Sequence, residues 1–260
     1  MGKKIAILSI LIGAFGVLMV YSASQVWADY KQGNEYFFLI RQLIFYLLGV
    51  VVFITFSKIK PNLFYKYSNH IFIASIILLV LVLIPGIGIV RGGARSWIGI
   101  ASFSIQPSEL SKIAVIIIIA KYLSMNFGKT TELKYLIPPL LIVGTVFGLI
   151  MLEPDFGTGA ILVCTILVML MISGIKRQYY YFGILGGVAA VVILVLSAPY
   201  RLERIFAFLD PFSDPLGGGF QIIQSLYAIV PAGLFGFGLF NSKQKYFYLP
   251  EPQTDIYIKL

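Results

Sequence analysis

IAILSILIGAFGVLMVYS, residues 5–22, is an apolar run that follows directly on Lys3 and Lys4. A helix needs about 20 mostly apolar residues to cross a hydrocarbon core about 30 Å thick. A secretory signal peptide is the alternative interpretation. No small-residue cleavage site followed by a soluble domain appears, however, and another apolar run comes next. The run therefore predicts a membrane-spanning helix.

Further runs of the same kind follow along the chain. The predicted spans are Ile5–Ser22, Gln42–Phe56, His70–Ile87, Leu110–Leu123, Tyr135–Leu152, Thr158–Ile172 and Tyr180–Ala198. The 260-residue chain is 59% hydrophobic and 12% charged, whereas a soluble domain has about a quarter charged residues. The sequence thus predicts an all-α polytopic membrane protein, with seven spans in residues 1–198.

The rare residue types argue against several kinds of site. The single cysteine, Cys164, leaves no disulfide framework or thiolate metal centre, and the single histidine, His70, argues against a Ser-His-Asp triad. The net charge of +9 is scattered between apolar runs. It therefore indicates membrane topology, and we expect no nucleic acid partner.

The basic residues predict the orientation of the chain. A cytoplasmic N-terminus places ten of them inside and five in the short outside loops, as the positive-inside rule favours. The inside set is Lys3, Lys4, Lys58, Lys60, Lys66, Lys121, Lys129, Lys134, Lys176 and Arg177, and the outside set is Lys31, Arg41, Arg91, Arg95 and Lys112. Ten of the eleven acids then fall outside, with Glu132 the exception. This asymmetry suggests chemistry on the outer face.

Residues 199–255 form a predicted long outer loop. Its stretch Gly217–Phe240 is apolar, but glycines, Gln221, Gln224 and Pro231 interrupt it. Such residues weaken a helix, so we expect a re-entrant or interfacial segment; an eighth span would instead place Asp255 in the cytoplasm. Residues 256–260 resemble the cut start of another span, and we expect a truncated or frameshifted product.

A first polar motif runs from Arg95-Ser96-Trp97 to Gln106-Pro107-Ser108-Glu109 and Lys112. Pro107 fits a first helical position, and Glu109 fits the first turn, where it can pair with Lys112. This structural interpretation leaves Arg95 and Trp97 unexplained. Ionisable groups at membrane depth are costly and are functional candidates by default, so a structural and a functional role both stay open here.

Two further motifs carry acids and bases. Glu153-Pro154-Asp155-Phe156-Gly157-Thr158 predicts a tight turn, although its two carboxylates also suit a cation or a basic side chain. The outer loop contains Arg201 and Arg204 near its start and Asp255 at its end. Arginines suit phosphate contacts, and a lone carboxylate beside them suits a general base.

Together these motifs resemble the SEDS family, which includes FtsW, RodA and SpoVE. The stretches Phe208-Leu-Asp-Pro-Phe-Ser-Asp-Pro and Lys245-Tyr-Phe-Tyr-Leu-Pro-Glu-Pro-Gln-Thr-Asp are closer to FtsW and SpoVE than to RodA. The resemblance covers the whole chain in order. It implies the start of a ten-span fold that polymerises lipid II into glycan strands outside the cell, serving division or sporulation. Roughly the last three spans of that fold are missing after Ile256–Leu260.

The resemblance also implies roles for individual residues. Asp255 corresponds to the proposed catalytic acid of the family. Arg95, Lys112, Arg201 and Arg204 are then expected to contact the diphosphate or the lipid headgroup, and Glu109 and Asp155 to shape the cavity. No cofactor is certain, although a divalent cation, Mg or Mn, suits a diphosphate.

The implied location is the bacterial plasma membrane, and the implied partners are a class B penicillin-binding protein and other divisome proteins. Two other functions stay open. One is a lipid II flippase, although no internal repeat of the kind found in transporters appears. The other is a scaffold that recruits the penicillin-binding protein and contributes no chemistry.

Overall fold

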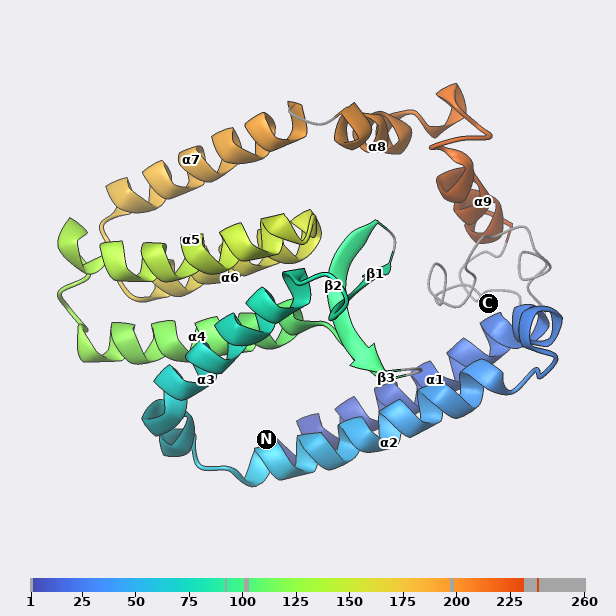
Figure 1. Ribbon diagram of the computed structural model, residues 1–260, viewed down its shortest axis with the longest axis horizontal. Coiled ribbons are helices and arrows are strands. Elements are labelled where there is room, and N and C mark those ends of the chain that lie inside the picture. Colours follow the sequence, from blue (N-terminus) through green and yellow to red (C-terminus); the bar gives the residue numbers. More distant parts are fainter. Residues whose placement is uncertain (1, 92, 101–102, 197–198, 232–237, 239–260) are drawn as a thin grey trace. The chain divides into compact units, whose positions relative to one another are not determined.

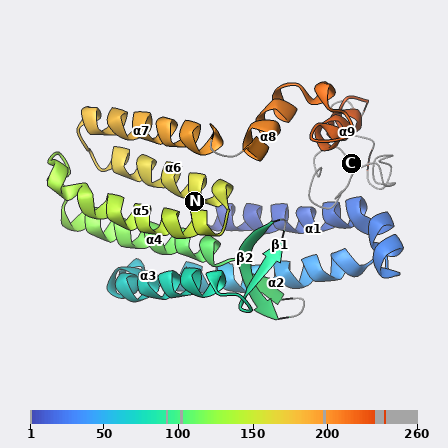
Figure 2. The same ribbon diagram turned by 45° about the horizontal axis from the view of Figure 1, so that its top comes forward.

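A computed structural model describes residues 2–91, 93–100, 103–196, 199–231 and 238. Figure 1 shows these elements in chain order, and Figure 2 shows them from a second direction. Helices dominate, as the sequence predicts, and the chain divides into two compact units, Met1–Ile59 with Ile193–Leu260 and Lys60–Val192. The elements are α1 (Gly2–Gln32), α2 (Phe37–Lys58), α3 (Pro61–Leu83), β1 (Gly88–Arg91), β2 (Ala94–Ile100), β3 (Phe103–Ile105), α4 (Pro107–Met125), η1 (Leu133–Tyr135), α5 (Ile137–Leu152), α6 (Phe156–Ile172), α7 (Arg177–Leu196), α8 (Pro199–Leu209), η2 (Pro211–Ser213) and α9 (Phe220–Ile229).

In the first unit α1 and α2 pack against each other as a hairpin. The Tyr46 hydroxyl on α2 donates a hydrogen bond to the Ile10 carbonyl on α1 at 2.8 Å. Gly13 makes room for that ring, since a Cβ there would lie 2.6 Å from Tyr46 Cε2. No residue of α2 is buried. An apolar helix without a buried face is typical of a membrane span, because lipid rather than protein covers it.

The second unit has its core among α3, α4, α5 and α6. Leu79, Ile119, Ile150 and Leu162 are fully buried there, one from each of these helices. Small residues allow α3 and α4 to approach closely, for Ser75 and Ser111 are buried on facing sides. The Ser111 hydroxyl lies 3.5 Å from the Ser75 carbonyl oxygen. Small side chains at helix contacts are a common way of packing in membranes.

The segment between α3 and α4 folds as a small antiparallel sheet in the order β1-β2-β3. This sheet is an addition to the predicted all-α class. The segment was predicted only as a loop, because short strands leave no apolar run of span length. Helix α3 ends at Leu83, before the predicted end of that span at Ile87. Pro85 accounts for this, because a proline disfavours helical geometry in the residue before it. Ile84 is indeed extended, with φ −71° and ψ 125°.

Each of the seven predicted spans overlaps one of the helices α1 to α7, in order, although α3 begins at Pro61 and not at the predicted His70. Four segments are long and apolar enough to cross a membrane, namely Gly2–Gln32, Phe37–Lys58, Pro61–Leu83 and Leu133–Leu152, and Phe156–Ile172 is a shorter apolar helix. These lengths establish a polytopic membrane fold for the part of the chain that the structure describes. The number of spans stays a prediction.

Residues 199–231 of the predicted outer loop contain α8, η2 and α9. A turn links η2 to α9, and the Asp214 carboxylate accepts hydrogen bonds there from the backbone N–H groups of Gly217 and Gly218. Helix α9 covers Phe220–Ile229, inside the stretch predicted to be re-entrant or interfacial. Its relation to a membrane stays a prediction, and residues 232–237 and 239–260 lie outside the described part.

Candidate functional site

The first two polar motifs of the sequence meet at one end of the second unit. Because α3 to α6 alternate in direction, α3 and α5 end where α4 and α6 begin. Gln106, just before α4, donates a hydrogen bond from Nε2 to Asp155 Oδ2 at 2.6 Å. This bond joins segments 49 residues apart and confirms that both motifs lie at the same end of the helices, as the topology predicts.

Asp155 is the N-cap of α6. Its carboxylate accepts hydrogen bonds from the Thr158 backbone N–H at 3.2 Å and from the Thr158 hydroxyl at 2.7 Å, in addition to the bond from Gln106. A side-chain oxygen at this position satisfies N–H groups that have no partner in the helix. Asp155 therefore has a clear structural role in the predicted turn, and its effect on the shape of a substrate cavity stays a prediction.

Glu153 is the least expected residue of this end. It follows directly on α5, one residue past the predicted span, and its side chain is fully buried. Neither carboxylate oxygen has a hydrogen-bond partner. Burial, with a smaller contribution from the nearby charge of Asp155, raises the pKa of Glu153 to about 8. At neutral pH this carboxyl group is therefore mostly protonated, because a buried charge without a partner is costly.

Glu109 and Lys112 form an ion pair on the first turns of α4. Lys112 Nζ lies 2.7 Å from Glu109 Oε1, which confirms the predicted pairing. Helix α4 begins at Pro107, also as predicted. The Lys112 side chain is 19% exposed and that of Glu109 is 54% exposed. An anion that reached Lys112 would therefore compete with Glu109 for it.

Arg95 contacts the C-terminal end of α3 from strand β2. Its Nη1 donates a hydrogen bond to the Leu83 carbonyl oxygen at 3.4 Å. The last carbonyl groups of a helix lack partners within it, and a cation near them is favourable. This contact gives Arg95 the structural reason that the sequence did not provide. Its predicted contact with a diphosphate stays a prediction.

The remaining predicted site residues belong to the first unit. Arg201 and Arg204 lie on α8, and the structure describes their backbone only. Asp255 lies outside the described residues. Within the second unit, the structure therefore brings together the residues of the first two motifs.

Sequence reasoning gave no role to Gln106 or to the burial of Glu153. The position of Gln106 immediately before Pro107 could have indicated its role, because this is the N-cap position of α4, at the end of the helix where Asp155 also lies. Glu153 gave no such signal, because a glutamate that follows an apolar run is usually exposed to water.

Within the described ranges, no group of three or more His, Cys, Asp or Glu side chains is placed to hold a metal ion. Glu153 and Asp155 supply two carboxyl groups in one turn. Divalent cations such as Mg²⁺ prefer six oxygen ligands, of which several are waters or substrate phosphates. The binding of a divalent cation therefore stays a prediction.

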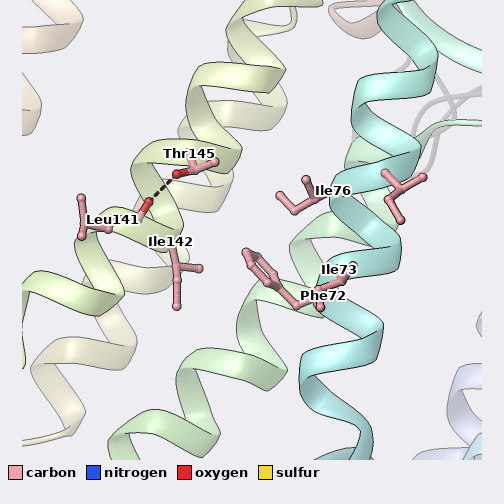
Figure 3. A pocket seen from close by; sticks show the side chains of 7 residues that line it. Phe72, Ile73, Ile76, Leu141, Ile142 and Thr145 are labelled. Carbon is pink, nitrogen blue, oxygen red and sulfur yellow. Dashed lines mark hydrogen bonds between the residues drawn. The ribbon is translucent and has the colours of Figure 1, made fainter.

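An apolar hollow of about 400 Å³ lies away from this end, between α3 and α5. Figure 3 shows Phe72, Ile73 and Ile76 on one side of it and Leu141, Ile142 and Thr145 on the other. The Thr145 hydroxyl donates to the Leu141 carbonyl oxygen within its own helix. The lining therefore offers hydrocarbon and no charge, which suits a lipid chain and gives no catalytic group.

Comparisons with known proteins cover nearly the whole chain. The sequence model described as "Cell cycle protein", of the FtsW, RodA and SpoVE group, matches residues 3–259. The chain is 49% identical to stage V sporulation protein E of Bacillus subtilis over 96% of its length and 69% of that protein's. It is 38% identical to a probable peptidoglycan glycosyltransferase FtsW of Coxiella burnetii over 96% of its length and 68% of the relative's.

A solved structure shares the fold. One chain in a study of how a peptidoglycan synthase complex coordinates polymerization and crosslinking aligns with a TM-score of 0.67 and 28% identity. The alignment covers 90% of this chain and 65% of that one. The present chain thus spans about two thirds of the length of the proteins that it resembles.

Proposed function

This chain belongs to the family of FtsW, RodA and SpoVE, and we propose that it acts in the bacterial plasma membrane as a peptidoglycan glycosyltransferase that polymerises lipid II. The observation that carries the proposal is the match of residues 3–259 to this family, with relatives named as probable peptidoglycan glycosyltransferases. The similarity to SpoVE and FtsW supports a role in sporulation or division rather than in elongation.

The proposed reaction joins an acceptor sugar hydroxyl to the anomeric carbon of a donor. The hydroxyl loses its proton as it attacks, and the lipid diphosphate leaves from the opposite side. One carboxylate suffices to accept the proton, and we assign that role to Asp255. Cations stabilise the charge that develops on the leaving group. We assign that role to Arg95, Lys112, Arg201 and Arg204.

The end of the second unit described above supports these assignments in part. Arg95 lies on β2 of the sheet and Lys112 lies on the first turns of α4. The Gln106–Asp155 bond holds the starts of α4 and α6 together. A fixed frame of this kind reduces the cost of orienting a substrate. A divalent cation, Mg or Mn, is a further proposal and would bind beside the diphosphate.

We also propose a class B penicillin-binding protein as the partner, within the divisome or the corresponding sporulation complex. The support is the similarity to a chain from a peptidoglycan synthase complex that both polymerises and crosslinks. The proposed orientation has the N-terminus in the cytoplasm, so that the Gln106–Asp155 end faces the outside, where lipid II is polymerised.

The test uses the protein purified together with its class B partner and supplied with fluorescent lipid II. We expect glycan strands from the wild-type protein, detected by gel electrophoresis, and none from Asp255→Ala. Glu203→Ala is the matched control, because it removes another acid of the outer loop, exposed on α8, and should leave polymerisation unchanged. Normal polymerisation by Asp255→Ala would overturn the assignment of the base. The absence of glycan strands from the wild-type protein would overturn the proposed activity.

A further inference from the structure

A second cavity lies at the opposite end of the second unit, between the start of α3 and the end of α4. Its volume is about 310 Å³. Three polar residues and several apolar ones share the lining, which consists of Pro61, Asn62, Phe64, Tyr65, Ile117, Ala120, Lys121 and Ser124. This mixed lining distinguishes the cavity from the hollow between α3 and α5, whose lining contains no charged residue.

Lys121 is the charged group of this cavity. Its side chain is half-buried, and α3 holds it in place. Its Nζ lies 3.4 Å from Asn69 Oδ1 and 5.2 Å from the centre of the Tyr65 ring. Both partners are neutral, and in the described part of the chain no carboxylate forms an ion pair with Lys121. Its positive charge is therefore fixed at the cavity and left unbalanced, which favours an anion there.

The surroundings of the cavity are basic as well. Lys60 and Lys66 are direct sequence neighbours of the lining residues Pro61 and Tyr65, and residues 57–70 contain no acid. The nearest acid along the chain after α4 is Glu132, which is already paired with Lys134 at 2.7 Å. Basic pockets between helices at the cytoplasmic side of a membrane are typical sites for anionic lipid headgroups, and the count of basic residues predicts that this end lies inside.

We propose that this cavity binds the phosphodiester headgroup of an anionic glycerophospholipid, with Lys121 as its counter-ion. Asn62 and Ser124 supply polar atoms for the headgroup, and Phe64 and Ile117 contact the first carbons of the acyl chains. These apolar walls favour a lipid over a free phosphate ion, because an ion gains nothing from them. The cavity lies at the other end of α3 and α4 from the Gln106–Asp155 bond, and the proposal does not depend on the proposed reaction.

The experiment titrates the full chain, purified in a neutral detergent, with short-chain phosphatidylglycerol and follows thermal unfolding. A ligand that binds the native state raises the unfolding midpoint. We expect phosphatidylglycerol to raise it, and short-chain phosphatidylcholine and inorganic phosphate to leave it unchanged. An equal rise with inorganic phosphate would identify a simple anion site and overturn the lipid assignment, as would an equal rise with phosphatidylcholine.

Two variants and one control locate the site. Lys121→Gln should weaken the apparent affinity for phosphatidylglycerol about fivefold, as expected for one lysine near a membrane surface. Ala120→Phe keeps the charge but fills the cavity, and should abolish the rise. Lys129→Gln removes an exposed lysine at the same end that does not line the cavity, and should change little. The proposal is overturned if both cavity variants bind like the wild type, or if Lys129→Gln weakens binding as much as Lys121→Gln does.

Discussion

At the scale of single residues, Asp155 shows how one carboxylate can organise the end of a helical bundle. It accepts three hydrogen bonds, two from Thr158 and one from Gln106. The first two stabilise the start of α6, and the third connects that start to α4. A residue that joins two helices in this way contributes to the geometry of any site built at their ends, whether or not it touches a substrate.

We expect Asp155→Ala to destabilise the protein by about 1–2 kcal/mol, which is the usual cost of losing an N-cap. Asp155→Asn should cost less, because its side-chain oxygen still accepts a hydrogen bond. Thermal unfolding in detergent measures both. Glu132→Ala is the control, since it removes an acid from an exposed ion pair and should not change the midpoint. An Asp155→Ala protein as stable as the wild type would show that the cap and the link to Gln106 contribute little.

The raised pKa of Glu153 predicts how the free energy of unfolding depends on pH. Its pKa in the folded protein is about 8, against an ordinary value of 4.5, so the folded state holds this proton more tightly than the unfolded state does. Its contribution to stability is therefore complete below about pH 4.5 and is lost as the pH rises to about 8. At its steepest the loss is about 1.4 kcal/mol per pH unit.

Glu153→Gln should remove this loss, because an amide stays neutral throughout. We expect the variant to unfold at a nearly constant temperature between pH 5 and pH 8, where the wild-type midpoint falls. Glu109→Gln is the control for the loss of a carboxylate at the same end of the bundle. If the wild type and Glu153→Gln showed the same pH dependence, Glu153 would not be the residue responsible for it.

At the scale of elements, the hairpin of α1 and α2 depends on a glycine. The Tyr46 ring occupies the space beside Gly13, and its hydroxyl reaches the Ile10 carbonyl. Any larger side chain at position 13 displaces that ring. The contact between the two helices is therefore specified by one small residue and one large one, as is common where helices pack in a membrane.

Gly13→Leu should destabilise the hairpin by about 1–3 kcal/mol, the usual cost of overpacking a close contact. Gly16→Leu is a matched control, because it lies on the same helix and a Cβ there meets no atom within 4 Å. Both variants are compared by thermal unfolding. Equal midpoints for the two would mean that Tyr46 moves aside without loss.

The sheet between α3 and α4 depends on another glycine. A Cβ on Gly88 would collide with the backbone carbonyl oxygen of Val82 and lie 2.8 Å from Arg95 Cγ. Strand β1 therefore passes directly over the end of α3, and the hairpin holds Arg95 against that end. This close approach gives the sheet a defined place at the end of α3.

At the scale of the whole molecule, the orientation in the membrane is a prediction that labelling can test. In a Cys164→Ser background, Arg91→Cys should react with a membrane-impermeant thiol reagent on intact cells, and Lys129→Cys should react only after permeabilisation. The physical reason is the excess of basic residues in the loops near Lys129, which the positive-inside rule keeps in the cytoplasm. The opposite labelling pattern would reverse the orientation and place the Gln106–Asp155 end inside.

The sequence alone determined the class of fold and the approximate positions of α1 to α7. The reason is physical: the length of an apolar run directly sets whether a helix can cross a membrane. It also determined local features such as the start of α4 at Pro107 and the pairing of Glu109 with Lys112. Both depend only on residues within one or two helical turns of each other.

Only the tertiary structure decided the contacts between distant segments. The Gln106–Asp155 bond, the burial of Glu153 and the contact of Arg95 with the end of α3 each require the helices to be packed first. The sheet was missed for a similar reason, since its strands are stabilised by pairing with one another and by packing on α3. Side chains far apart in the chain acquire their chemistry from neighbours that only the folded bundle supplies.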